Sequence, residues 1–226
     1  MPLTYSWGLP KGGLILPSAY YSTTFPANET PISEGGRWAR NQSNAWTNVK
    51  ASGGNALGTQ VDNSYDDSYA ILQGDWGADY KLTATVFRSA SISAANHEVE
   101  LNVRFLDDAD SVRGYETLLN KDGNIQIFRW DDLFGNFTEI TPTGTTSVGS
   151  VPDGASFEVQ IVGNTITVRY DSAGGTPVTQ CTADVTSIGG TNYTTGNPAI
   201  AFFCRPSVEG SNPDHFGFKS VTVMRL

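Results

Sequence analysis

The sequence predicts an all-β fold, a sandwich of two antiparallel sheets. The clearest observation is residues 97–105, HEVELNVRF, where apolar and polar side chains alternate without a break. Such a strand packs one face into a core and leaves the other face polar. Turn sequences at 120–123 and 163–164, each between two β-prone segments, are typical of hairpins. The 24 glycines, with many threonines, serines and asparagines, favour strands and turns over helices.

Residues 1–19 are expected to be an N-terminal arm or linker, because prolines and a Gly-Gly pair interrupt any regular element there. Residues 20–226 are then expected to form a single sandwich domain. Short β-prone segments recur along them, and at most one short helical turn is expected, at 184–189. In chain order, the expected strands are 20–25, 46–51, 56–60, 68–72, 80–88, 97–105, 114–119, 124–130, 137–140, 156–162, 165–170, 177–183, 199–204 and 216–225.

Composition and charge exclude several classes of function. The net charge of −9 argues against a nucleic-acid partner, because a phosphate backbone requires a basic surface. No apolar run approaches the roughly 20 residues that span a bilayer, so no membrane partner is expected. The only two histidines are His97 and His215, and no Gly-x-Ser-x-Gly motif accompanies them, which disfavours a serine hydrolase or a zinc enzyme.

Localisation is expected to be extracellular or on a virion surface. The N-terminus has no basic region before its short apolar patch, so it is not a signal peptide. Either a signal has been removed, or the protein leaves its cell by another route, such as lysis. Cys181 and Cys204 fall in separate expected strands. They are compatible with one disulfide in an oxidising compartment or with two buried thiols.

Several segments together resemble the concanavalin A-like lectin/glucanase superfamily, the jelly roll of laminin-G-like domains, legume lectins and family 16 glycoside hydrolases. They are YYSTTFPANETPISEGGRW at 20–38, GDWG at 74–77, EVEL at 98–101 and NPDHFGF at 212–218. The order of these segments carries the resemblance, which covers roughly residues 20–226. It implies a jelly-roll sandwich with a sugar site on the concave face of one sheet.

The resemblance also implies which residues serve the site. The row on the concave face would be Glu98, Glu100, Asn102 and Arg104. In the superfamily a structural Ca²⁺ often ties the loop of the first strand to the last strand, and the implied ligands here are Asp214 and Asn28.

The sequence departs from the family 16 hydrolases at their catalytic motif. That motif resembles Glu-x-Asp-x-x-Glu, whereas this chain has Glu98 and Glu100 without the third carboxylate. The family 16 mechanism therefore does not transfer, and we lean against an enzyme. The two carboxylates remain candidates for catalysis, because residues i and i+2 of a strand lie about 6.5–7 Å apart, near the separation found in inverting glycosidases.

A possible aromatic platform follows at 124–130. Gln126, Phe128 and Trp130 share one face of this expected strand, and Ile125 and Ile127 share the other. One face must be buried in the core, and the sequence does not decide which. If Trp130 faces solvent, it can stack on a sugar ring.

The most favoured function is a non-catalytic, lectin-like module that binds a glycan or polysaccharide on the concave sheet. Two alternatives stay open. One is a phage virion surface, decoration or fibre protein of the same fold, docked on a larger assembly through its N-terminal arm. The other is a glycoside hydrolase or polysaccharide lyase that uses Glu98 and Glu100.

Overall fold

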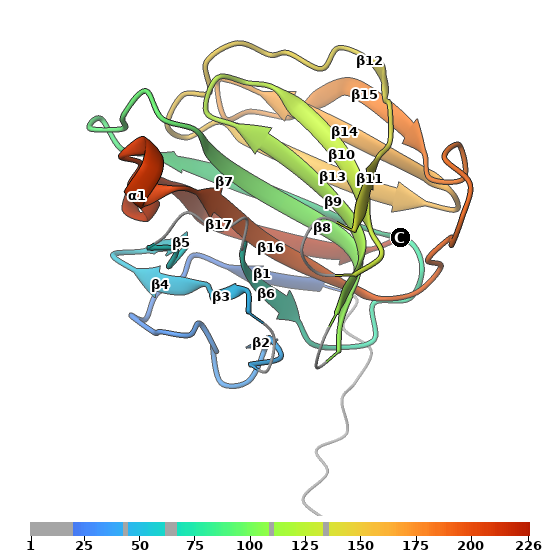
Figure 1. The fold of residues 1–226 in the computed structure, drawn as a ribbon, viewed down its shortest axis with the longest axis horizontal. Coiled ribbons are helices and arrows are strands. Elements are labelled where there is room, and N and C mark those ends of the chain that lie inside the picture. Colours follow the sequence, from blue (N-terminus) through green and yellow to red (C-terminus); the bar gives the residue numbers. More distant parts are fainter. Residues whose placement is uncertain (1–19, 43–44, 62–66, 109–110, 133–135) are drawn as a thin grey trace, which may run out of the picture.

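The protein is a sandwich of two sheets (Figure 1). The predicted N-terminal arm lies outside the part of the chain that the structure describes. No helix in that part has the length and apolar character needed to cross a membrane. The computed structural model describes residues 20–42, 45–61, 67–108, 111–132 and 136–226.

Seventeen strands in the described residues form a nine-stranded and an eight-stranded sheet, antiparallel except at one short pairing. The nine-stranded sheet runs β12 (Thr143–Gly144), β15 (Val178–Asp184), β14 (Thr165–Asp171), β13 (Ser156–Val162), β7 (Tyr80–Arg88), β17 (Phe216–Arg225), β5 (Asn55–Leu57), β4 (Lys50–Ser52), with β1 (Tyr20–Thr23) also on β17. The eight-stranded sheet runs β11 (Phe137–Glu139), β10 (Ile125–Trp130), β9 (Val112–Asn120), β8 (His97–Asp107), β16 (Asn197–Cys204), β6 (Ser68–Leu72), β2 (Trp38–Ala39), with β3 (Thr47–Asn48) parallel to β6.

The main core lies between the two sheets. Val99, Leu101 and Val103 of β8 enter it, and so do Ile125 and Ile127 of β10. Each is buried, and each such side chain contributes about 1.5–3 kcal/mol by leaving water. The predicted all-β, two-sheet antiparallel sandwich is confirmed.

A second hydrophobic cluster lies on the outer face of the eight-stranded sheet, the face turned away from the main core. Except for Trp46, which precedes β3, its members lie on strands that also supply the main core. We refer to it as the outer cluster, and it comprises Trp46, Tyr69, Ile71, Phe105, Val112, Trp130, Ala199 and Ala201.

The expected hairpins form, and the expected strand at 46–51 divides. The turns at 120–123 and 163–164 join β9 to β10 and β13 to β14, and a further turn joins β4 to β5. Within 46–51, β3 pairs in the eight-stranded sheet and β4 in the nine-stranded sheet, so the chain crosses between the layers at the fully buried Val49. Sequence patterns gave no sign of the two-residue strands β2 and β12, or of the short helices α1 (Pro206–Glu209) and η1 (Pro213–His215). In the segment 184–189, Asp184 ends β15 and residues 185–188 form turns rather than a helix.

A β-bulge interrupts β8 at Arg104. Its φ of 51° is unusual for a residue with a side chain, and the pairing of β8 with β9 shifts register between Val103 and Leu106. The alternation therefore reverses, and Phe105 joins the outer cluster instead of the main core. The predicted unbroken alternation from residue 97 to 105 is wrong at its last two positions.

The two cysteines are buried free thiols in different sheets, Cys181 in β15 and Cys204 in β16. Burial raises the pKa of each thiol to about 11, so both are protonated at neutral pH. Of the two arrangements compatible with the sequence, the structure has the pair of thiols.

Candidate functional site

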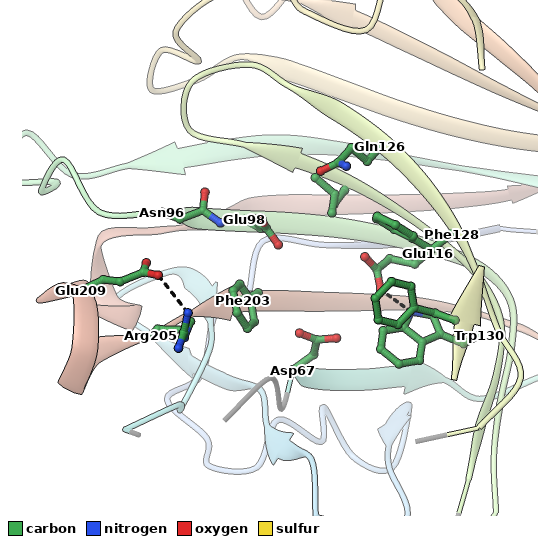
Figure 2. A pocket seen from close by; sticks show the side chains of 12 residues that line it. Asp67, Asn96, Glu98, Glu116, Gln126, Phe128, Trp130, Phe203, Arg205 and Glu209 are labelled. Carbon is green, nitrogen blue, oxygen red and sulfur yellow. Dashed lines mark hydrogen bonds and ion pairs between the residues drawn. The ribbon is translucent and has the colours of Figure 1, made fainter. Parts of the chain in front are cut away.

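A cleft of about 280 Å³ lies on the outer face of the eight-stranded sheet (Figure 2). Strands β8, β9, β10 and β16 form its floor, β11 one wall, and α1 part of the opposite rim. Aromatic, carboxyl and amide side chains meet in it. The lining residues are Asp67, Asn96, Glu98, Glu116, Leu118, Gln126, Phe128, Trp130, Phe137, Phe203, Arg205 and Glu209.

The two-residue period of the strands explains why these side chains share one face. On β10, Ile125 and Ile127 enter the main core, so Gln126, Phe128 and Trp130 point to the cleft. The sequence left open which face of this strand is buried, and the structure shows that the face with Ile125 and Ile127 is the buried one. The aromatic platform is on the outer face.

The aromatic wall is formed by rings in mutual contact. The Trp130 ring is 5.0 Å from that of Phe137 and 4.9 Å from that of Trp46, measured between centroids, and Phe128 meets Phe137 edge-on at 5.3 Å. Trp130 is only 6% exposed, whereas Phe137 is 46% exposed and Phe128 is half-buried. The open apolar surface of this wall thus belongs mainly to the two phenylalanines, and Trp130 supports them from beneath.

Phe203 supplies an apolar surface on the other side. It follows Phe202, which enters the main core, and so it faces the cleft from β16. Beyond it, Arg205 forms an ion pair of 3.4 Å with Glu209 of α1. Both charged groups line the rim of the cleft.

Carboxyl groups collect at the centre of the cleft. Figure 2 shows Asp67, Glu98 and Glu116 projecting into it from three different segments. Glu98 accepts a hydrogen bond of 2.6 Å from the amide of Asn96. Burial raises the pKa of Glu98 to about 7, so this carboxyl exchanges protons near neutral pH.

Glu116 and Glu100 are buried more deeply. Burial raises the pKa of Glu116 to about 8, against the opposing effect of the hydrogen bond donated by Trp130 Nε1. Burial also raises the pKa of Glu100 well above its ordinary value, and the neighbouring charges of Asp67 and Glu116 raise it further. Oxygens of Asp67, Glu100 and Glu116 all lie within 4.8 Å of one another. This buried acidic triad has the donors to hold a metal ion.

The predicted row on β8 is only partly available in the cleft. Glu98 lines it, but Glu100 is 1% exposed and Asn102 is fully buried, so both lie beneath the surface. Trp130 lines the cleft as well. Access to a ligand thus differs among the residues that the sequence placed in one row.

Arg104 does not share the face of the row, and that prediction is wrong. The bulge turns its side chain to the end of the sandwich, where its guanidinium donates to the carbonyls of Ala78, Gly163 and Tyr193 and also meets the carboxylate of Asp79. The side chain is 2% exposed. Arg104 thus holds three loops together.

The two residues implied for a calcium ion have protein partners. Asp214 forms an ion pair with Lys50 of β4, and the side-chain oxygen of Asn28 accepts a hydrogen bond of 3.0 Å from the backbone of Gly53. Both contacts attach loops to the β4–β5 hairpin. An ion at these two residues stays a prediction.

Sequence reasoning missed Glu116, Phe203 and Arg205. Asp67 was a metal candidate as part of the acidic turn at 62–67, but it was not placed with Glu98 in one cleft. For Glu116 a signal exists, because Tyr115 and Leu119 enter the main core and the alternation of β9 places Glu116 opposite to them. Asp67 and Phe203 reach the same cleft only because β16 lies between β8 and β6 in the sheet. This strand order is not visible in the sequence.

Comparison with known proteins defines the fold. No family model and no curated protein matches the sequence. Among solved structures, the exoplasmic/lumenal domain of VIP36 in its Ca²⁺/Man-bound form matches with a TM-score of 0.59 at 13% identity, over 91% of this chain and 89% of that one. The carbohydrate-binding module CBM66 of Bacillus subtilis matches with a TM-score of 0.53 at 12% identity, over 86% and 95%.

A third match is the CBM2 module of the evolved Dit of Lactobacillus casei BL23 phage J-1, with a TM-score of 0.54 at 11% identity, over 93% of this chain and 99% of that one. Identities this low establish the fold alone. The fold is the concanavalin A-like jelly roll, as the resemblance in the sequence implied.

Proposed function

We propose that the protein binds a glycan or polysaccharide in the cleft on the outer face of the eight-stranded sheet. The observation that carries the proposal is the meeting of exposed aromatic rings with carboxyl and amide groups in one hollow of about 280 Å³. Ligand sites of this kind combine apolar walls with a few well-placed polar groups.

The aromatic rings suit the apolar faces of sugar rings. Phe128 and Phe137 present surface on one side of the cleft and Phe203 on the other, so a pyranose ring between them has a partner for its C–H groups. Burial of this apolar area favours binding at roughly 25 cal/mol per Å².

The polar groups suit sugar hydroxyls, which both donate and accept hydrogen bonds. Gln126 and Asn96 offer amides, and Glu98 offers a carboxyl with a pKa of about 7. Because this carboxyl exists in both protonation states near neutral pH, it is able to donate or accept. The neighbours named above, one a carbohydrate-binding module and one a Man-bound domain, support the proposal at the level of fold.

A glycan array followed by calorimetry on the full chain tests the proposal. We expect millimolar to micromolar binding to at least one glycan, weakened about tenfold or more, ~1.4 kcal/mol, by Phe128→Ala or Phe203→Ala. Phe87→Ala is the matched control, because Phe87 is also half-buried but lies on β7 of the other sheet. Absence of any response, or equal weakening by the control, would refute the proposal.

We propose binding without turnover. Glu98 lines the cleft, but its predicted catalytic partner Glu100 is 1% exposed, so the pair presents one accessible carboxyl to a ligand. Release of reducing ends from the bound polysaccharide, measured in the same samples, distinguishes a hydrolase. Release that Glu98→Gln abolishes would replace the binding proposal with an enzymatic one.

A second candidate is a virion protein that uses the same cleft to bind a host glycan. The likeness to a module of a phage Dit supports it. In this second proposal the protein acts on a particle surface and docks on a larger assembly through residues 1–19. In the first proposal the protein acts outside a cell. Peptides of this chain in purified particles from the source organism, identified by mass spectrometry, would support it. Particles that lack them would exclude it.

We also propose a structural Ca²⁺ near Asp214 and Asn28, as the resemblance implies. Such an ion would have to displace Lys50 from the carboxylate of Asp214. We expect added CaCl₂ to raise the thermal stability of the wild type, and Asp214→Asn to reduce this increase.

A further inference from the structure

The buried acidic triad beneath the cleft has no use in the glycan proposal. Asp67, just before β6, Glu100 of β8 and Glu116 of β9 bring one oxygen each within 4.8 Å of the others. All three side chains are buried. Three like charges this close strongly disfavour the ionised state unless something neutralises them.

The protein supplies little positive charge to two of the three. Within the described residues, neither Glu100 nor Glu116 has an ion pair with a lysine or arginine. Glu116 receives a hydrogen bond from Trp130 Nε1, and Oε2 of Glu100 has no hydrogen-bond partner. Buried carboxylates without partners are costly, so they take up protons or coordinate a metal.

A fourth polar group, outside the triad, is also buried without a hydrogen-bond partner. Asn102 follows Glu100 by two positions on the same face of β8, and its amide is close enough to act on the pKa of the Glu100 carboxyl, lowering it against the effect of burial. Asn102 is fully buried, and neither its Oδ1 nor its Nδ2 makes a hydrogen bond. A cation between the carboxylates would give the amide oxygen of Asn102 and Oε2 of Glu100 a partner at the same time.

We propose that Asp67, Glu100 and Glu116, with the amide oxygen of Asn102, bind one hard divalent cation such as Ca²⁺ or Mn²⁺. The donors are all oxygens, with no histidine or cysteine among them, which selects this class of metal. Three carboxylates, some of them bidentate, and one amide approach the roughly six to eight oxygens that Ca²⁺ prefers. Asp67 and Glu116 also line the cleft, so the ion has a route from solvent.

The site deepens the proposed function without depending on it. A cation in this position would neutralise the floor of the cleft, next to Glu98 and Trp130. It is separate from the calcium ion implied at Asp214 and Asn28, because the triad lies on β8, on β9 and just before β6, whereas Asp214 pairs with Lys50 of β4. Metal binding and glycan binding are measured independently, so either can fail without the other.

Terbium luminescence on the chelator-treated full chain tests the site. Trp130 is hydrogen-bonded to Glu116, so Tb³⁺ held by the triad lies near an indole that sensitises its emission. We expect emission that saturates at one ion per chain and that Ca²⁺ displaces. Glu100→Gln and Glu116→Gln, which keep the shape of the side chain, are expected to weaken Tb³⁺ binding about tenfold or more.

Glu139→Gln is the matched control, because Glu139 is an exposed carboxylate on the neighbouring strand β11. It should leave the affinity for Tb³⁺ unchanged. Calorimetry with CaCl₂ alone provides a second readout, and circular dichroism shows that each variant is folded. Absence of saturable emission and of calcium heat, or equal affinity in the folded triad variants and wild type, would overturn the proposal.

Discussion

Arg104 has a structural role that its place in a polar row conceals. Its positive φ breaks the alternation of β8, its backbone approaches two glycines closely, and its side chain joins three loops through their carbonyls. A Cβ at Gly114 would lie 2.5 Å from the carbonyl oxygen of Arg104, and one at Gly196 would lie 2.3 Å from its carbonyl carbon. The bulge therefore requires glycine on both sides.

Gly114→Ala tests this requirement. Its φ of 135° is unfavourable for alanine, and the new methyl group would collide with backbone that has no room to move. We expect a loss of unfolding free energy at least about 2 kcal/mol larger than in the control, measured by urea denaturation. The control is Gly149→Ala, where φ is also positive, at 76°, but nothing lies within 4 Å of the added Cβ. Equal losses in the two variants would show that the bulge tolerates a side chain.

At the scale of elements, three neighbouring strands of the nine-stranded sheet share a charge cluster. Glu158 of β13 accepts hydrogen bonds from Thr83 of β7 at 2.7 Å and from Arg169 of β14 at 2.6 Å, and it forms an ion pair with Lys81 at 3.3 Å. Burial acts to raise the pKa of Glu158, but these partners outweigh it and hold the pKa below 4.5. Because the ionised form is favoured in the folded state, the cluster stabilises the fold at neutral pH.

Glu158→Gln should therefore lower stability in a pH-dependent way. We expect a loss of about 1–3 kcal/mol in unfolding free energy at pH 7, from weaker hydrogen bonds to a neutral group. A carboxyl group whose pKa is lower in the folded state than in the unfolded state stabilises the fold at pH values above its unfolded pKa. This contribution disappears as the pH falls through the folded pKa. The difference from wild type should thus shrink below pH 4.5. A difference that stays constant in urea titrations across this range would contradict the assignment.

Element by element, the sequence predicts the sandwich well and the site less well. Alternation correctly placed Val99, Leu101 and Val103 in the core, because a side-chain period of two is a local property. The bulge at Arg104 escaped prediction, because it depends on glycines in other segments. Glu116 and Phe203 were missed, and Asp67 was not placed beside them, because strand order, a long-range property, brings the three to one cleft. Trp130 was a candidate for stacking on a sugar ring. In the structure it lines the cleft, but it supports the aromatic wall from beneath and forms little of the open surface.

At the scale of the whole molecule, the two sheets differ in what their outer faces carry. The nine-stranded sheet packs one face on the core and carries the Glu158 cluster on the other, whereas the eight-stranded sheet carries the core on one face and the cleft on the other. Both the outer cluster and the acidic triad are built on the second sheet. The chemistry of the protein is thus concentrated on one side of the sandwich.

Strand β17 lies inside the nine-stranded sheet, with β7 along one edge and β5 and β1 along the other. Tyr20 pairs with Met224 and Leu82 with Val223, so the partners of this strand are separated from it by well over a hundred positions. During synthesis on the ribosome, the two parts of this sheet stay unjoined until residues 216–225 have left the exit tunnel. Such distant pairings also slow folding. Assembly of this sheet therefore has to wait until residues 216–225 have been synthesised.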